Sequence, residues 1–360
     1  MSRNADWAHA LQRIIDEHNW RHANKAKNVS HKTMRERTQI LFQAFRQLRR
    51  LGFQPAPRGL DGNHVQTLLW FWTADPRVEE LCEKHDVAMP EKPLSPATLQ
   101  ARLSTLRVFC RWISKPGMVL VPERYVTDPA LVRRTYVAQE DKSWTAQGVD
   151  AAEIVARVSA IDRFIAAMVD IILHFGLRKK EAAMLAPHWA VVPASMVPIA
   201  NPMAAFYLML IEGTKGGRLR FVPIDTEAKR RAIDRAQQVA AHRYSHLGRP
   251  GHSLKQTLDR FSYVMRKVGV TKGQLRVTIH GLRHQFANDL YVALTEIQSP
   301  VRGGKPTDLQ RHVVACLEIS RQLGHARPQI STAYLGSSVV MRSKATQRLP
   351  GTDSAGPDST

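Results

Sequence analysis

The sequence predicts a mainly helical protein with a small antiparallel β-sheet, divided into two domains. Apolar residues recur at helical spacing through the first 118 residues and again from about residue 150 onward. A β-rich stretch at 206–211 and an alternating stretch at 218–222 flank a glycine-rich turn, which indicates a hairpin. With 360 residues, 44% of them hydrophobic, the chain is long enough to bury the cores of two domains.

Positive charge dominates the composition. The chain carries a formal net charge of +21 and has a pI of about 10.4. Such an excess speeds encounter with polyanions, so nucleic acid is the first candidate partner, and a basic protein that merely stays soluble is the alternative. We expect no membrane partner because no run of about 18 apolar residues appears. The N-terminus has no apolar signal core, which favours a cytoplasmic location.

The first 118 residues read as a helical domain with one strongly basic face. A helix at 35–51 has an apolar stripe, an apolar stretch follows at 65–72, and Ser95-Pro96 provides an N-cap and a first helical position. Basic side chains lie on the polar face of the first helix and upstream of it: Lys25, Lys27, Arg46, Arg49 and Arg50. They form either an ordinary solvated face or a surface for the DNA phosphate backbone.

The rest of the chain divides by composition. Residues 119–150 are mixed and polar, with prolines and a glycine, which indicates a linker. The helical pattern resumes in a second domain at 151–340, with one apolar series from Ile154 to Ile172. The tail at 341–360 is expected to be disordered. The cysteines Cys82, Cys110 and Cys316 are far apart and in apolar patterns, so we expect buried free thiols and no metal site.

A His and an Arg stand at the predicted start of a helix near residue 280. The β-branched residues 277–279 indicate an extended approach, after which apolar residues recur at helical spacing. His280 and Arg283 are three positions apart, so one helical turn lets both reach the same object. The N–H groups of the first turn favour an anion at that place.

Other polar residues that could take part in a reaction are spread along the second domain. Arg178 follows a break at Gly176, and Glu181 is positioned to hold an Arg or a His, although a surface Arg–Glu pair would contribute little. Lys215 lies at the glycine-rich hairpin tip, where it is either solvated or a mobile proton donor. His325 follows Leu-Gly, and Tyr334 stands nine residues later.

The order of these residues resembles that of the tyrosine recombinases, also called the phage integrase family. The matching stretches are Gly176-Leu177-Arg178-Lys179-Lys180-Glu181, Thr214-Lys215-Gly216, His280-Gly281-Leu282-Arg283-His284, Leu323-Gly324-His325 and Ser331-Thr332-Ala333-Tyr334. The resemblance covers about 150 to 340 in detail. The N-terminal region matches the family's core-DNA-binding domain only in size, charge and helicity.

The resemblance implies a role for each matched residue. Arg178 and Arg283 would clamp the scissile phosphate, and His280 and His325 would add donors, with His280 a candidate to move the proton of the tyrosine. Lys215 would protonate the leaving 5′ oxygen, and Tyr334 would be the nucleophile that forms a 3′-phosphotyrosyl link. Glu181 would lie behind the residues that contact the phosphate and hold one of them in place. Two guanidiniums can neutralise a phosphodiester without metal, and the covalent link conserves the bond energy, so no cofactor or ATP is implied.

One departure from the family pattern lies between Arg283 and His325. Residues 295–306 are extra material, which we expect to form a basic surface loop carrying Arg302 and Lys305. The insertion leaves His312 as a competitor for the role of His325. His325 is preferred because it has the preceding Leu-Gly and the trailing tyrosine.

The resemblance implies a two-domain clamp around double-stranded DNA, in the cytoplasm at the nucleoid. The expected function is site-specific recombination, as integration or excision of a mobile element or phage. It further implies a homotetramer on two sites, with the region after Tyr334 passing to a neighbouring subunit, and it leaves room for an accessory DNA-bending protein. The alternatives are a relaxing type IB topoisomerase and a non-catalytic basic DNA-binding protein.

Overall fold

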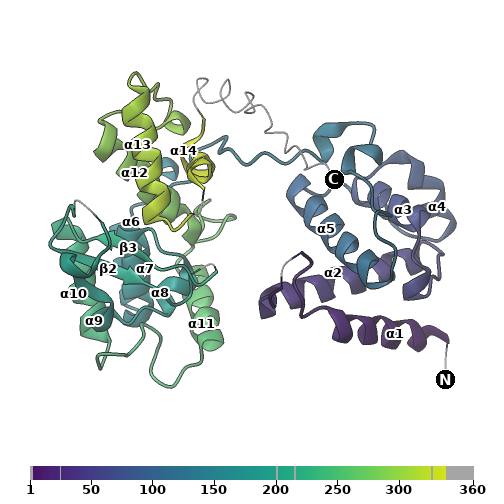
Figure 1. Cartoon of the computed structure of the whole chain (residues 1–360), viewed down its shortest axis with the longest axis horizontal. Helices are drawn as coiled ribbons and strands as arrows, with labels where there is room; N and C mark the ends of the chain where they lie inside the picture. The colour runs from purple at the N-terminus through teal and green to yellow at the C-terminus, as the bar shows by residue number, and fades with distance from the viewer. Residues whose placement is uncertain (1–2, 25, 200–201, 215, 326, 338–360) are drawn as a thin grey trace, which may run out of the picture. The chain divides into compact units, whose positions relative to one another are not determined.

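The computed structural model describes residues 3–24, 26–199, 202–214, 216–325 and 327–337. The chain forms two compact units, Met1–Thr135 and Tyr136–Thr360 (Figure 1). Each unit has a hydrophobic core of its own. Within the described ranges, no helix is both long enough and apolar enough to cross a membrane.

Helices are the main elements in the described part of the first unit. Its helices are α1 (Arg3–His18), α2 (His31–Arg50), α3 (Gly62–Trp72), α4 (Glu79–Lys84) and α5 (Pro96–Trp112). The side chain of Ser95 accepts a hydrogen bond from the backbone N–H of Thr98, and Pro96 opens α5, as the sequence predicts. The apolar stripe of α2 packs on α3 and α5, so the polar face of α2 is left outside the core.

The expected linker contributes to both units. Its first part packs in the core of the first unit, with Val119, Tyr125, Val126 and Val132 buried. Trp144 and Val149, near its other end, are buried in the core of the second unit. The division falls between Thr135 and Tyr136, inside a short exposed stretch at 133–136. Residues 119–132 therefore lie with the first unit rather than between the two.

The second unit is built around one almost completely buried helix. Its helices are α6 (Ala151–Ser159), α7 (Arg163–Phe175), α8 (Lys179–Ala183), α9 (Pro187–Ala190), α10 (Glu227–Val239), α11 (Leu254–Lys267), α12 (Ile279–Thr295), α13 (Leu309–Gln322) and α14 (Thr332–Leu335). Helix α7 is buried on most sides, and α6, α10 and α12 pack against it. Helices α12 and α13 lie side by side, next to α14 (Figure 1).

The predicted hairpin is present and belongs to a three-stranded antiparallel sheet. Strands β1 (Val191–Pro193), β2 (Phe206–Leu210) and β3 (Arg220–Pro223) lie in the order β1-β2-β3. Leu208 pairs with Val191 on one side and with Val222 on the other. The first strand is too short for its apolar alternation to be recognised in the sequence, which is why only the hairpin is predicted.

One sequence expectation about this unit is wrong. The apolar series from Ile154 to Ile172 is broken, because Asp162 accepts hydrogen bonds from the N–H groups of Phe164 and Ile165 and thereby starts α7 as a new helix. Residues 296–306 form a loop with Lys305 exposed, as expected, but Ser299 is buried and Arg302 forms ion pairs that fix the loop to its neighbours. The three cysteines are free and buried, as expected.

Candidate active site

The start of α12 is fixed by a buried tryptophan. Trp144 is fully buried, and its indole N–H donates to the backbone oxygen of Thr278, the residue that precedes α12. Gly281 is required beside it, because a Cβ there would lie 2.6 Å from the backbone oxygen of Lys142. The helix start is thereby held in place, with His280 and Arg283 in its first turns as the sequence predicts.

Arg283 is the central residue of the site. Its side chain is completely buried, and it donates to the backbone oxygens of Gly176 and Leu323. Its Nε donates to the hydroxyl of Tyr334 over 3.0 Å, and Nη2 lies 3.2 Å from Nε2 of His325. Burial lowers the pKa of the guanidinium to about 10, so the side chain remains a cation at neutral pH.

Tyr334 lies among three histidines. The centre of its ring is 4.8 Å from that of His284, 5.6 Å from that of His325 and 6.0 Å from that of His280. The residue itself is only 5% exposed, and His284 is equally well buried. Desolvation is the largest cause that lowers the pKa of the imidazoles of His280 and His284, and neighbouring cations lower it further. Both rings are therefore neutral at pH 7.

Arg178 is held at the N-terminus of α8 by Glu181. The carboxylate of Glu181 accepts from the backbone N–H of Arg178 at 2.7 Å and from its Nη1 at 2.6 Å. The same carboxylate receives a fork of two hydrogen bonds from Arg220 on β3, at 3.0 and 2.8 Å. The Arg178 side chain remains 25% exposed, whereas Glu181 is fully buried. Glu181 thus holds both the accessible guanidinium of Arg178 and the buried guanidinium of Arg220.

The contribution of Glu181 to stability depends on pH, because the pKa of its carboxyl is shifted in the folded protein. Burial would raise the pKa of the carboxyl, but hydrogen bonds and charges from Arg220 and Arg178 outweigh it and lower the pKa to about 2, from 4.5. Since the folded pKa is the lower one, the stabilisation is complete above the unfolded pKa and is lost as the pH falls toward 2. A shift of this size corresponds to about 3 kcal/mol.

We therefore expect Glu181→Gln to lower the free energy of unfolding by about 3 kcal/mol at pH 7, with a smaller difference at about pH 3. Urea unfolding of both proteins across this range measures the difference. Glu296→Gln removes an exposed carboxylate paired with Arg311 and should show little change at any pH. The lowered pKa of Glu181 would be contradicted if the loss of unfolding free energy in Glu181→Gln stayed constant or grew as the pH fell.

His325, rather than His312, belongs to this cluster. Nδ1 of His312 lies 2.7 Å from the hydroxyl of Tyr291, and its Nε2 lies 3.8 Å from the sulfur of Cys316. These contacts form a separate buried cluster between α12 and α13. His325 contacts both Arg283 and the ring of Tyr334. The preference for His325 drawn from the sequence therefore agrees with the geometry.

Lys215 lies outside the described residues, but the base of its hairpin is well defined. Gly213 has a φ of +72°, and a Cβ there would lie 2.9 Å from the backbone oxygen of Lys180. The hairpin therefore leaves the sheet in direct contact with α8. Thr214 donates to the backbone oxygen of Ile211, which closes the turn. The hairpin base lies next to Glu181, and the role of Lys215 stays a prediction.

The basic residues of the first unit are mostly accessible. Lys27, Arg46 and Arg50 are exposed, whereas Arg49 is half-buried with its guanidinium 4.9 Å from the ring centre of Trp7. Lys25 lies outside the described residues.

Within the ranges that are described, no group of three or more His, Cys, Asp or Glu side chains could hold a metal ion.

Sequence reasoning missed two charged or titratable residues of the site. Arg220 supplies the strongest pairing of Glu181, yet in sequence it is only a basic residue in an alternating strand. His284 is next to Arg283 in the matched stretch and packs on the tyrosine ring, but the helical spacing gave it no role. The place of Arg220 at the start of an apolar strand, directly before Phe221 and Val222, is the signal that could have indicated it.

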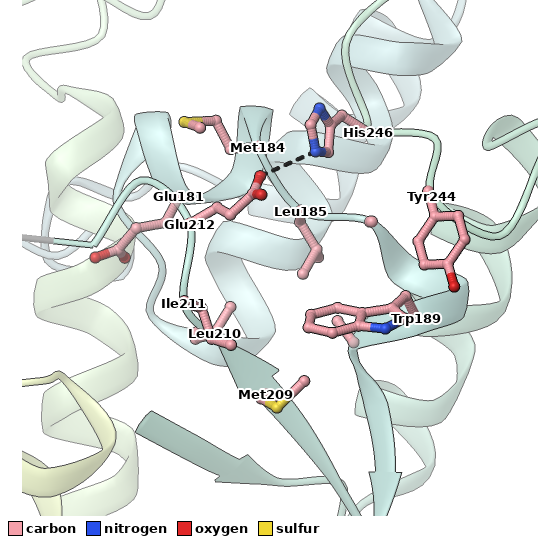
Figure 2. A pocket seen from close by; sticks show the side chains of 12 residues that line it. Glu181, Met184, Leu185, Trp189, Met209, Leu210, Ile211, Glu212, Tyr244 and His246 are labelled. Carbon is pink, nitrogen blue, oxygen red and sulfur yellow. Dashed lines mark ion pairs between the residues drawn. The ribbon is translucent and has the colours of Figure 1, made fainter. Parts of the chain in front are cut away.

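A separate apolar pocket lies behind α8 (Figure 2). It has a volume of about 240 Å³ and is lined by residues of α8, α9, β2 and the segment around Tyr244. Glu212 and His246 form an ion pair of 3.0 Å at its edge. Glu181 is the site residue that reaches it, and its carboxylate points away from Trp189. The pocket does not open onto Tyr334 and is not assigned to the site.

A family model and curated relatives match part of this chain in sequence. Residues 145–289 match the family model described as Integrase. A tyrosine recombinase XerC of Xanthomonas campestris pv. campestris is 26% identical over 215 residues, which cover 58% of this chain and 59% of the relative. The chain thus spans about three fifths of the length of the curated relatives it matches.

Solved structures share the fold. The Tn1549 transposon integrase in complex with transposon right end DNA has a TM-score of 0.51 at 15% identity, covering 94% of this chain and 97% of that one. A lambda integrase dimer bound to a core site has a TM-score of 0.50 at 14% identity, covering 90% and 94%. At these identities the likeness shows the fold alone.

The chain shares the fold of the Tn1549 and lambda integrases, and it places Arg283 and three histidines around one buried tyrosine. It is similar to the tyrosine recombinases, and residues 145–289 match the Integrase family model.

Proposed function

We propose that the protein is a site-specific DNA recombinase that cuts and rejoins strands through a 3′-phosphotyrosyl intermediate. One observation supports this most strongly: the hydroxyl of Tyr334 accepts a hydrogen bond from Nε of Arg283 at 3.0 Å, inside a cluster of histidines. A nucleophilic oxygen held against a cation is the arrangement that attack on an anionic phosphodiester needs. The match of residues 145–289 to the Integrase family model, and the similarity to a tyrosine recombinase XerC, support the same chemistry.

In the proposed mechanism the phosphate is bound between the two arginines. Arg178 is the accessible one and meets the non-bridging oxygens first, while Arg283 supplies its charge from below. In the chain without DNA, the phenol occupies the Nε donor of Arg283. When the phosphate binds, one of its oxygens must therefore either share the Nε donor of Arg283 with the phenol or replace the phenol there. The two groups that react would then be in contact through a single guanidinium.

The proton movements are assigned by position. The imidazole of His280 is neutral and lies near the ring of Tyr334, so it can accept the proton of the tyrosine. His325 contacts Arg283 and provides a further donor to the phosphate. Lys215 protonates the 5′ oxygen that leaves, reaching it from the hairpin that contacts α8. Glu181 acts on Arg178 and not on the substrate.

The partner is double-stranded DNA, bound by both units in the cytoplasm at the nucleoid. A lambda integrase tetramer bound to a Holliday junction shares the fold, with a TM-score of 0.51 at 12% identity, which supports a homotetramer on two sites as the active assembly. The likeness to the Tn1549 transposon integrase supports integration or excision of a mobile element as the biological reaction. An accessory DNA-bending protein belongs to the same proposal.

Strand exchange between two differently labelled duplexes distinguishes this function from its rivals. A recombinase produces duplexes that carry both labels, without ATP or divalent metal. A relaxing type IB topoisomerase would remove supercoils and exchange no partners. A non-catalytic binding protein would form neither a covalent adduct nor recombinant products. Relaxation without exchange, or binding without cleavage, would therefore refute the proposed function.

We expect the exposed face of α2 to carry part of the affinity for DNA. Log affinity falls as log salt rises, and replacing Arg46 and Arg50 by Gln should make this fall shallower by about 1 to 2. The reason is that binding releases one fewer counterion for each phosphate contact that is lost. Replacing the exposed Lys84 and Lys92 by Gln changes the net charge equally and should leave the slope unchanged. Equal losses in both double variants would contradict the assignment. Fluorescence anisotropy across a salt series measures the slopes.

A further inference from the structure

A completely buried asparagine connects Tyr334 to residues 297–304, which lie within the extra stretch 295–306. Nδ2 of Asn288, on α12, donates to the backbone oxygen of His284 at 2.8 Å and to that of Tyr334 at 3.4 Å. Its Oδ1 accepts from the hydroxyl of Ser299, which is also fully buried. Both ends of one amide thus join α12, the 297–304 segment and the backbone of Tyr334.

The chain after the tyrosine lies directly on the same segment. Gly336 has a φ of +76°, and a Cβ there would lie 2.9 Å from the backbone nitrogen of Val301. A side chain at position 336 would therefore push α14 away from the 297–304 segment. Helix α14 is only four residues long, and the last carbonyls of a helix lack partners within it. The amide of Asn288 supplies a partner for the carbonyl of Tyr334.

Arg302 anchors the segment from its other side. Its Nε donates to Asp141 at 2.8 Å and its Nη1 to Asp289 at 3.0 Å, with the side chain largely buried. The 138–143 stretch that carries Asp141 also reaches α14, because the N–H of Ala138 donates to the backbone oxygen of Thr332 at 2.9 Å. The 297–304 segment is therefore fixed to the same neighbours that hold α14.

We propose that Asn288 is a positioning residue for Tyr334, and that the 297–304 segment keeps Asn288 in place through Ser299. The inference rests on the proposed role of Tyr334 as nucleophile. The hydrogen bond fixes the backbone at the tyrosine itself, and thereby the place of the phenol beside Arg283. Small displacements of a reacting group reduce rates steeply, by about a hundredfold for 1 Å.

The test compares four variants in the full chain. Asn288→Ala removes the bond to Tyr334, and Ser299→Ala removes only the support of Asn288. Ser299→Thr keeps the hydroxyl and should restore what Ser299→Ala loses. Arg311→Ala is the matched control, because Arg311 pairs with Glu296 and Leu294 near the same segment without contacting Asn288 or α14.

Two measurements are made on each variant. The first is amide hydrogen exchange without DNA, read by mass spectrometry on peptides covering 329–337. The second is the single-turnover rate of adduct formation on a nicked suicide duplex, beside the affinity for that duplex. We expect Asn288→Ala and Ser299→Ala to exchange faster by about tenfold in this peptide alone and to cleave at least about tenfold more slowly, with affinity within about twofold. Ser299→Thr and Arg311→Ala should match the wild type.

The outcomes separate this inference from the proposed function. If the wild type forms no adduct but exchange rises locally as expected, the proposed nucleophile fails and the contact that orders α14 stands. If both alanine variants cleave and exchange like the wild type, the inference is overturned. Faster exchange spread over the whole second unit would also overturn it, because the contact would then serve stability in general. Should Asn288→Ala fail to fold, the pair Ser299→Ala and Ser299→Thr decides the question.

Discussion

Tyr334→Phe should bind DNA with wild-type affinity and trap no covalent adduct on a nicked suicide duplex. The substitution removes one oxygen from a ring that stays packed among His284, His325 and His280. It leaves the arginines and the basic surfaces unchanged, so binding should persist. Loss of the only proposed nucleophile should lower the cleavage rate at least about a thousandfold. Denaturing gels detect the adduct, and anisotropy measures the affinity.

Two other tyrosines provide the controls. Tyr291 is buried and bonded to His312, and Tyr263 is about half exposed on α11 beside Arg260. Their partners are His312 and Arg260 rather than Arg283, so Phe at either position should leave adduct formation intact. An adduct formed by Tyr334→Phe and lost in one of the other two variants would move the nucleophile there.

The second large effect concerns the leaving group. An alkoxide leaves poorly near neutral pH, so Lys215→Ala should slow cleavage about a hundredfold or more. A thiolate leaves readily, since the pKa of a thiol is about 8.5. Lys215→Ala should therefore recover on a duplex whose bridging 5′ oxygen at the scissile position is replaced by sulfur. The measurement is the single-turnover rate on the two substrates.

Arg283→Lys is the matched contrast. It keeps the positive charge but loses the planar donors that contact Tyr334, Gly176 and Leu323, so we expect a loss of about a hundredfold or more. Sulfur at the bridging position leaves the non-bridging oxygens unchanged, and this variant should not recover. Arg178→Ala should behave like Arg283→Lys. Equal recovery of all variants, or of none, would remove Lys215 from the role of acid and direct the search to Lys179, Lys180 or His280.

The helices and the hairpin could be predicted because their signals are local. Ser95-Pro96 marks the start of α5, and Gly176 ends α7 with a φ of +62°. The paired stretches 206–211 and 218–222 become β2 and β3. The order of Arg178, His280, Arg283, His325 and Tyr334 was recognised from short motifs, and the structure brings Arg283, His325 and Tyr334 into contact and places His280 near the ring.

What could not be predicted depends on contacts between distant segments. Arg220 meets Glu181 across 39 positions, and Asn288 meets Tyr334 across 46. No periodicity or turn residue marks such pairs. Residues 295–306 look like a loop because glycine, proline and basic residues fill them, yet Ser299 and Arg302 secure them to α12 and to Asp141. The break between α6 and α7 was missed because a capping aspartate interrupts an otherwise continuous apolar series.

Mapping the covalent adduct tests the central claim most directly. The wild-type protein is reacted with a nicked suicide duplex, digested with protease and nuclease, and sequenced by mass spectrometry. The account predicts a nucleotide attached to Tyr334 through the 3′ phosphate of the cut strand, with a free 5′ hydroxyl on the other fragment. A nucleotide on any other residue, a link through a 5′ phosphate, or cleavage with no protein attached would contradict it.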